Sequence, residues 1–305
     1  MKRKQKIQNA SAIICSDLHL TEQTPECRLD DYIKAQRSKL LFISDLQKQY
    51  KCPVLCAGDI FDHWKPSPWL ISFALQYLPD ELIAIPGQHD LPQHNLNLIE
   101  KSGFNALIQG GRIKLFQDEF GRRIHEAFDL YPVPFGQKIP EIEFVKHQNV
   151  LMLHQLIWQK EPWPGADPKG NARALLKNNP DFDLIITGDN HQAFTEEYEG
   201  RLLINPGSML RKTADQIDFK PRVYLWDAES NTAEPVYLPI EAGVVSRRHI
   251  EIKEERKNRL DAFINIIKSE EFEIGVSFEE TVRKVLETRN INQTIRAKVL
   301  EALDS

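Results

Sequence analysis

Residues that bind divalent metal ions recur along this 305-residue chain, each directly after a short apolar run. Five runs end in a carboxylate, an imidazole or an amide oxygen, and the residues concerned are Asp17 and His19, Asp59, Gln88 and His89, His154, and Asp189 and His191. Parallel strands present the residues beyond their carboxyl ends at one edge of a sheet, so we expect these side chains to lie close together. Two divalent ions held there can activate water and stabilise charge on a phosphoryl group. The pattern therefore predicts a dinuclear metal site for hydrolytic chemistry.

Asp59 is the central residue of this prediction. It follows Gly58 and the apolar run Val54 to Ala57, which indicates a buried strand that delivers a carboxylate to a loop. A bridging carboxylate can hold two cations close together. The alternative is that Gly58 and Asp59 only form a turn or cap a helix, and that each histidine is a hydrogen-bonded structural residue. The five runs taken together favour the metal site.

The elements that must position these residues alternate in type along the first third of the chain. Apolar runs predict strands at Ala12 to Ser16, Val54 to Ala57 and Leu82 to Ile85. Helical spacing of apolar residues predicts a helix over Leu29 to Tyr50, and a second helix begins with serine as its cap and proline at its first position, over Ser67 to Leu78. This β-α-β-α-β order favours a parallel sheet with helices on its faces.

The later predicted elements are mostly strands. A short helix is expected at Asn95 to Lys101, and β runs from Arg112 to Phe135, broken at Asp118 to Gly121, suggest a hairpin. The segment from Gln155 to Gly170 contains three prolines and predicts a long irregular loop. Further strands are predicted at Val150 to Leu153, Asp183 to Thr187, Arg201 to Ile204, Arg222 to Trp226 and Glu234 to Leu238.

Composition limits the class of protein. The hydrophobic fraction of 41% and the charged fraction of 27% are typical of a globular protein. No apolar run approaches the roughly 20 residues that cross a membrane, and the run behind the basic N-terminus is too short for a signal peptide. Four cysteines without a zinc-finger pattern are expected to be free thiols in a reducing cytoplasm. The net charge of −5 argues against a surface that binds nucleic acid all over, although a local basic groove remains compatible with it.

Two parts are expected along the chain. Residues 1–245 should form the main α/β domain. After Val245 the sequence becomes charged and helical and lacks proline, with 12 basic and 12 acidic residues from Ser246 to the end. Residues 246–305 are therefore predicted to form a small helical extension that binds a partner or caps the domain.

The order of these motifs carries a family resemblance. Asp-x-His, Gly-Asp, Gly-x-His-Asp, His and Gly-x-x-His, over roughly residues 12 to 210, resemble the calcineurin-like metallophosphoesterase superfamily. Within it, Gly58 to Pro68 (Gly-Asp-Ile-Phe-Asp-x-x-Lys-Pro-Ser-Pro) resembles SbcD-type exonuclease subunits of DNA repair and recombination, including phage counterparts. The resemblance implies a layered β-sandwich flanked by helices, two divalent metal ions, a partner ATPase of the SbcC type and a homodimer.

The resemblance also implies a role for each ligand residue. It assigns the first metal ion to Asp17, His19, Asp59 and His191. It assigns the second ion to Asp59, Gln88, His154 and Asp189, so that Asp59 bridges both. In such enzymes the residue at His89 is not a ligand but acts on the transition state or the leaving oxygen, and Asp90 orients it. The implied reaction is hydrolysis of a DNA phosphodiester by a metal-bound hydroxide.

Two positions depart from the family pattern, and both belong to the second ion. Gln88 stands where the family has asparagine, and Asp189 stands where it has the first histidine of Gly-His-x-His. Gln88 offers the same amide oxygen on a longer side chain, while Asp189 replaces a neutral nitrogen with an anionic oxygen. Ligands rich in oxygen favour manganese or magnesium over zinc, so manganese is the expected cofactor.

Other residues near these motifs are candidates for contact with substrate. Asp62 and His63 follow the Gly-Asp motif, and the alternative for them is an exposed helix start. Lys65 is a candidate for phosphate contact. Aromatic residues of a long loop can stack on bases but can also fix the loop to the domain. The loop aromatics are Trp158 and Trp163, and the further candidates for phosphate contact are Ser208, Arg211 and Lys212.

Two alternatives to a DNA nuclease stay open at this point. A phosphatase or cyclic-nucleotide phosphodiesterase for small substrates would use the same ligands. A protein that has lost chemistry at the second metal ion could be a non-catalytic scaffold.

Overall fold

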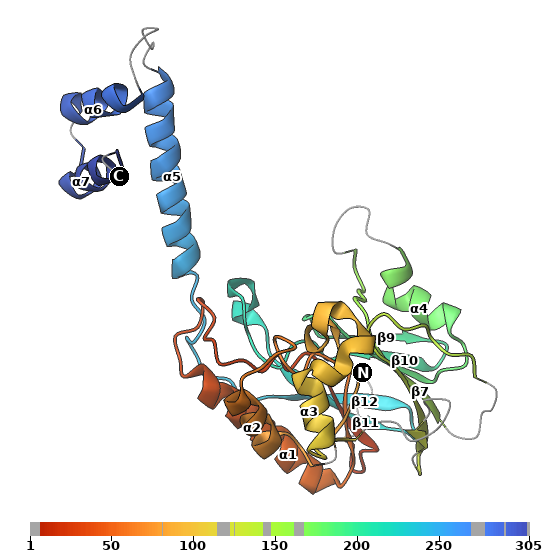
Figure 1. Cartoon of the computed structure of the whole chain (residues 1–305). Helices are drawn as coiled ribbons and strands as arrows, with labels where there is room; N and C mark the ends of the chain where they lie inside the picture. Colours follow the sequence, from red (N-terminus) through yellow and green to blue (C-terminus); the bar gives the residue numbers. More distant parts are fainter. Residues whose placement is uncertain are drawn as a thin grey trace. The chain divides into compact units, whose positions relative to one another are not determined.

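The computed structural model describes residues 7–80, 82–114, 123–124, 126–142, 148–161, 168–269, 278–289 and 291–303. Tertiary contacts divide the chain into two units, Met1–Ser246 and Arg247–Ser305. The first unit holds the strands, and the second holds the helices α5 (Arg248–Ser269), α6 (Phe278–Thr288) and α7 (Gln293–Leu303) (Figure 1). Within the second unit, the apolar side chains of α6 at Val282, Val285 and Leu286 are buried.

Two six-stranded sheets form the centre of the first unit. The first has the order β12-β11-β1-β2-β3-β4, and its strands are β12 (Thr232–Tyr237), β11 (Arg222–Asp227), β1 (Ala12–Cys15), β2 (Val54–Cys56), β3 (Leu82–Ala84) and β4 (Ile113–Lys114). The second has the order β5-β6-β7-β8-β10-β9, and its strands are β5 (Arg123–Ile124), β6 (Phe128–Val133), β7 (Gln148–His154), β8 (Leu184–Gly188), β10 (Arg201–Asn205) and β9 (Phe194–Tyr198). Strands β1 to β4 run parallel, as do β6, β7, β8 and β10.

The central strands are buried on both faces because their side chains alternate between two hydrophobic clusters. Ile14 and Leu55 point between the sheets and pack in one cluster with Ile186 of the second sheet. Ile13 and Val54 point to the opposite face and belong to the cluster that includes residues of the helices. Those helices are α1 (Tyr32–Tyr50), α2 (Pro68–Tyr77) and α3 (Gly103–Gln109).

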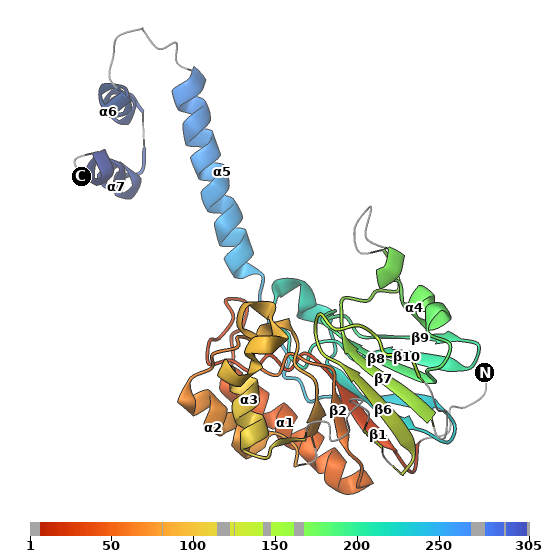
Figure 2. The ribbon, with the colours of Figure 1, turned by 45° about the vertical axis from the view of Figure 1, so that its right-hand side comes forward.

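A separate cluster covers the outer face of the second sheet. Leu175 and Leu176 of α4 (Ala172–Asn178) pack there against Ile185 and Leu203. The layers of the first unit are therefore helices, sheet, sheet and helix, and Figure 2 shows α1 to α3 and α4 on opposite sides of the strands. This layered β-sandwich confirms the expected fold class.

The helix starts follow their capping residues. Ser67 accepts the backbone N–H of Leu70, and Pro68 occupies the first helical position of α2, as the sequence predicts. Asp31 caps α1 by accepting the N–H of Lys34. The segment predicted as a helix at Asn95 to Lys101 is a 3₁₀ helix over Leu96–Lys101.

The hairpin predicted over Arg112 to Phe135 is wrong as a single unit. Strand β4 pairs in parallel with β3 in the first sheet, whereas β5 pairs antiparallel with β6 in the second. The chain therefore changes sheets within this segment, and the antiparallel pair is confined to residues 123–133. The predicted turn at Asp118 to Gly121 lies outside the described residues. Alternation of side chains within a strand cannot show which sheet the strand joins.

All four cysteines are buried and form no disulfide, and Cys15 and Cys56 are register partners on β1 and β2. Among the described residues, no helix has the combination of length and apolar character that spanning a membrane requires.

The packing between the sheets predicts how much stability the protein loses when a buried side chain there is shortened. Leu55→Ala should lower the free energy of unfolding by about 2–5 kcal/mol, because Leu55 is fully buried between the two sheets. The matched substitution Leu41→Ala removes a side chain that is 45% exposed and should change stability by less than about 1 kcal/mol. Urea denaturation measures both, and equal losses would contradict the assignment of Leu55 to the core.

Candidate metal centre

The ends of five strands meet at one edge of the two sheets. Strands β1, β2 and β3 of the first sheet lead into Asp17, Asp59 and Gln88, while β7 ends at His154 and β8 leads into Asp189. Among the described residues, ligand atoms lie within 4.8 Å of one another in three groups: Asp17, His19 and His191; Asp17, Asp59 and His154; and His19, Asp62 and His89. The structure thus brings together residues that are up to 174 positions apart in sequence, from 17 to 191.

Asp59 lies between histidines of both predicted metal positions. Its Oδ1 accepts the backbone N–H of His89 at 3.0 Å. Its Oδ2 is buried without a hydrogen-bond partner, 3.6 Å from Nε2 of His19 and 3.4 Å from Nε2 of His154. Burial opposes ionisation, but the imidazoles of His154 and His19 outweigh it and hold the pKa of Asp59 below its usual range. One free carboxylate oxygen is therefore placed to serve two cations.

The surrounding polar atoms fit a pair of cations. Buried atoms without hydrogen-bond partners include Asp17 Oδ2, Asp59 Oδ2, Gln88 Oε1 and His154 Nε2. Unpaired buried oxygens and nitrogens are costly, and coordination to metal ions satisfies them. In addition, Nε2 of His19 lies 3.0 Å from Nε2 of His191, and each is 3.9 Å from Asp17 Oδ1. These donors match the imidazole and carboxylate ligands of divalent metals.

His154 has its tautomer set by the backbone. Its Nδ1 donates a hydrogen bond to the carbonyl of Ala57 at 2.6 Å, which leaves Nε2 facing Asp59. Burial lowers the pKa of His154, but the Asp59 carboxylate outweighs it and raises the pKa to about 10. A positive charge therefore belongs at this position, and a proton and a metal ion compete for it.

The two residues that depart from the family pattern contact each other. The Gln88 amide donates to Asp189 Oδ1 at 2.5 Å, so the Gln88 oxygen remains unpartnered and faces the interior. The backbone N–H of Asp189 donates to Asp17 Oδ1 at 3.0 Å. Asp189 belongs to none of the three ligand groups within the described part of the chain. Its carboxylate positions the Gln88 amide and supplies negative charge beside it.

Several ligand positions have a strained backbone. Asp17, His19, Asp59 and Asp189 all have positive φ, between 45° and 82°. Asp tolerates this region better than most residues, whereas His19 does so less readily. Strain of this kind persists where surrounding contacts fix the conformation, and it is concentrated at functional sites.

Asp62, predicted as a substrate contact, instead orients a ligand. Its Oδ1 lies 3.2 Å from Nδ1 of His19, and it also pairs with Nζ of Lys212. Burial opposes ionisation of Asp62, but these two partners hold its pKa well below the usual range. A carboxylate behind a metal-binding histidine fixes the ring and increases its basicity. Lys212, a candidate phosphate contact, is engaged in this ion pair.

Asp90 does not contact the His89 ring, whereas His89 is exposed beside the candidate ligands. The His89 side chain is exposed, lies edge-on to His19 with ring centroids 5.0 Å apart, and has Nδ1 3.0 Å from the carbonyl of Asp62. The Asp90 carboxylate accepts the backbone N–H groups of Ile60, Phe61 and Gly87. Asp90 therefore fastens the loop after β2 to the loop after β3, and the expectation that it orients the His89 ring is corrected. Burial and the charge of Asp59 raise the pKa of Asp90 to about 7.

Two further candidates for substrate contact are buried. The Trp158 side chain is 7% exposed, and Gly170 packs directly on its ring, so it fixes the loop and cannot stack on a base. Ser208 is fully buried, and its backbone N–H donates to the carbonyl of His191 at 3.2 Å. Ser208 therefore supports the His191 loop and does not present an N–H to phosphate. Trp163 lies outside the described residues.

Of the remaining candidates for substrate contact, two are exposed and one is buried. His63 and Lys65 are exposed directly after Asp62, where substrate can reach them. Arg211 is 7% exposed and donates to the backbone carbonyls of Ile217 and Glu241. Arg211 thus belongs to a different cavity from the metal centre.

Sequence reasoning missed the residues that hold the loops of the centre. Asn205 is fully buried, and its amide donates to the carbonyls of Asn190 and Gln192 at 2.6 Å each, on both sides of His191. Gly87 also contributes by its lack of a side chain, since a Cβ there would lie 2.1 Å from Asp59 Oδ1. Both residues occur in motifs typical of a plain turn, Asn-Pro-Gly and Pro-Gly, so their types alone give no signal of these contacts.

Gly87 offers a test that leaves every ligand in place. Gly87→Ala should displace the Asp59 carboxylate and reduce bound metal to well below that of the wild type, because the added Cβ overlaps Asp59 Oδ1. Metal content after dialysis, measured by plasma mass spectrometry, checks this outcome. Gly200→Ala is the control, since a Cβ at Gly200 meets nothing within 4 Å and only its φ of 76° is strained. Equal metal content in both variants would contradict the contact.

Known proteins resemble this chain in sequence and in fold. A sequence profile described as calcineurin-like phosphoesterase matches residues 11–193. Solved structures with a similar arrangement include an archaeal phosphodiesterase, with 15% identity, coverage of 74% of this chain and 99% of that chain, and a TM-score of 0.40. Another is the protein TT1561 of Thermus thermophilus, with 10% identity, coverage of 76% and 100%, and a TM-score of 0.44.

A third solved structure is a metallophosphoesterase from Sphaerobacter thermophilus, with 13% identity, coverage of 75% and 89%, and a TM-score of 0.35. Identities and TM-scores at this level say nothing about the substrate of this chain. No curated protein sequence matches the chain.

Proposed function

Because this chain belongs to the calcineurin-like phosphoesterase family, we propose that it hydrolyses DNA phosphodiester bonds, as an exonuclease or endonuclease subunit of the SbcD type in DNA repair or recombination. The proposal of hydrolytic activity is supported by Oδ2 of Asp59, which lies between His19 and His154 without a hydrogen-bond partner. The preference for DNA is supported by the resemblance of Gly58 to Pro68 to SbcD-type subunits.

The ligands divide into two sets that share one residue. The residues that would hold the first ion are Asp17, His19, Asp59 and His191. The residues that would hold the second are Asp59 and His154, with Gln88 and Asp189 beside them. When bound, two such ions lower the pKa of a water molecule and neutralise charge that develops on the phosphoryl group. Asp62 keeps the His19 ring in place from behind.

His89 is the residue that would meet the leaving group. Its Nδ1 is engaged by the carbonyl of Asp62, so Nε2 is the ring atom left to contact substrate. A protonated Nε2 can donate its proton to the leaving oxygen as the phosphodiester bond breaks. The exposed side chains of His63 and Lys65 follow Asp62 in the loop after β2 and would contact the nucleic acid backbone.

The proposal includes interactions of the whole chain. In this proposal the chain forms a homodimer and binds a partner ATPase of the SbcC type. The partner would contact the second unit, Arg247–Ser305. A reducing cytoplasmic setting is also part of the proposal and is supported by four buried cysteines that form no disulfide.

A single assay separates this proposal from its alternatives. With manganese, the protein should cleave linear DNA, and Asp59→Asn should lower the rate about 100-fold or more, because the bridge between both ions is lost. Asp45→Asn, an exposed carboxylate of α1, should leave the rate unchanged. Turnover of an aryl phosphate without DNA cleavage would show a small-molecule phosphatase instead. Failure on both substrates would show a non-catalytic scaffold.

The identity of the metal is a separate prediction. Because carboxylate and amide oxygens make up much of the second set, manganese should restore more DNA cleavage to the metal-stripped protein than zinc, and magnesium should restore part of it. Rates measured over a titration of each metal check this order. Full activity with zinc and none with manganese would contradict it.

A further inference from the structure

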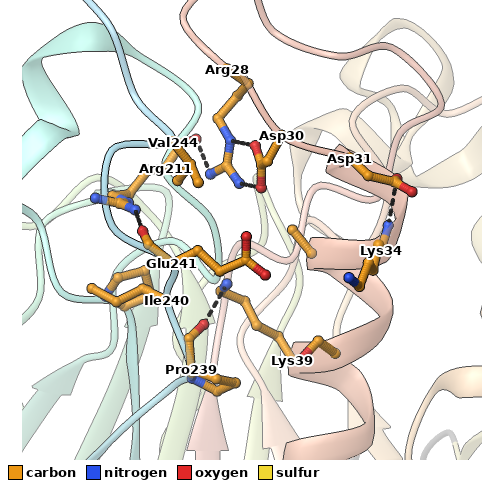
Figure 3. A pocket seen from close by; sticks show the side chains of 13 residues that line it. Arg28, Asp30, Asp31, Lys34, Lys39, Arg211, Pro239, Ile240, Glu241 and Val244 are labelled. Carbon is orange, nitrogen blue, oxygen red and sulfur yellow. Dashed lines mark hydrogen bonds and ion pairs between the residues drawn. The ribbon is translucent and has the colours of Figure 1, made fainter.

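A cavity of about 180 Å³ lies in the first unit, apart from the residues of the candidate metal centre. One wall is the segment that leads into α1, with Arg28 and Asp30, and another is α1 itself, with Lys39. The remaining wall carries Arg211 and Glu241 (Figure 3). None of these residues belongs to the ligand groups of the metal centre.

The inner lining of the cavity is positively charged. Arg28, Lys39 and Arg211 are only 7%, 4% and 7% exposed. Of the three carboxylates of the lining, Asp30 is 12% exposed and pairs with Arg28, whereas Asp31 and Glu241 are exposed. Three buried cations within one cavity are unusual in a chain whose net charge is −5.

Hydrogen bonds hold all three cations in place, but within the described part of the chain only Arg28 also forms an ion pair with a carboxylate. Arg28 forms a bidentate pair with Asp30, at 2.8 and 2.6 Å, and donates to the carbonyl of Arg211 at 3.1 Å. Lys39 donates to the carbonyl of Pro239 at 2.9 Å, and Arg211 donates to backbone carbonyls as described above. Neither Lys39 nor Arg211 forms an ion pair with a described residue.

This arrangement leaves donors and charge in excess. An ammonium group has three N–H donors, and Lys39 uses one of them on Pro239. Burial lowers the pKa of Lys39 to about 8, and the charges of Arg28 and Arg211 add to this effect and outweigh the opposing carboxylates of Asp30 and Glu241. Burial likewise lowers the pKa of Arg211. A bound anion would offset the repulsion among the three cations.

We propose that this cavity is a binding site for a phosphate-type oxyanion, held by Lys39 and Arg211 with Arg28 beside them. Guanidinium and ammonium groups are the usual partners of tetrahedral oxyanions, through charge-assisted hydrogen bonds. Glu241 at the rim limits the affinity by repulsion. The site is independent of the proposed nuclease activity, since it shares no side chain with the metal centre.

The cavity is nevertheless connected to the metal centre through one segment of chain. Arg211 is followed by Lys212, which pairs with Asp62, and Asp62 contacts His19. An anion bound to Arg211 would therefore fix the segment that supports a metal ligand. Its source is either a free inorganic anion or the terminal phosphate of a nucleic acid, since both present the same chemistry.

Calorimetric titration of the full chain with sulfate, in the presence of manganese, tests the site. Lys39→Met should weaken sulfate binding about tenfold or more, because it keeps the aliphatic chain and removes the charge. Glu241→Gln should tighten binding a few-fold, because it removes the repelling carboxylate from an exposed position. Lys48→Met, an exposed lysine of the same helix, should bind as the wild type does.

Two outcomes would overturn the site: no measurable sulfate binding by the wild type, or wild-type affinity in both Lys39→Met and Glu241→Gln. Because Glu241 is exposed, Glu241→Gln keeps the test valid if Lys39→Met does not fold.

Trinucleotides with phosphorothioate linkages distinguish the two sources of the anion. Tighter binding of the 5′-phosphorylated form than of the 5′-hydroxyl form, lost in Lys39→Met, assigns a terminal phosphate. Equal binding of both forms, together with Lys39-dependent sulfate binding, assigns a free anion.

Discussion

The structure of the centre depends on the placement of negative charge where two sheets meet. Asp17 and Asp59 are both almost completely buried, and each keeps an oxygen without a hydrogen-bond partner. Burial of carboxylates in this way is unfavourable unless positive charge is close. The histidines around them supply ligand atoms, and divalent ions would complete the balance of charge. The glycines, the strained loops and the buried amide of Asn205 all serve to hold this arrangement.

The pairing of Gln88 with Asp189 changes how the departures from the family pattern are understood. As separate substitutions, each weakens the case for a second ion. In the structure the Asp189 carboxylate accepts the Gln88 N–H group, which directs the Gln88 oxygen toward the interior. Gln88 and Asp189 thus act as a hydrogen-bonded pair. The Gln88 amide oxygen supplies the acceptor that asparagine supplies in the family pattern.

Much of the fold could be predicted from sequence because the signals are local. Apolar runs such as Val54 to Ala57 and the cap at Ser67 depend on nearby residues alone, and the structure confirms them. Contacts between distant loops could not be predicted in this way. Asp90 bonds to the backbone of Ile60 and Phe61, and Ser208 bonds to His191, so their roles follow from tertiary packing. For the same reason, the sequence placed the ligands together but did not show that Asp62 supports His19.

The hydrogen bond between His154 and Ala57 has a consequence for the spacing of ligand residues from the two sheets. It joins the end of β7 in one sheet to the end of β2 in the other, and Gly188 lets the backbone of β8 approach Ala57 as well. The distance between Asp59 and His154 is therefore set by the thickness of the sandwich, that is, by the volume of side chains such as Leu55 and Met152 packed between the sheets. The volume of the hydrophobic interior therefore sets how far apart the ligand residues of the two sheets lie.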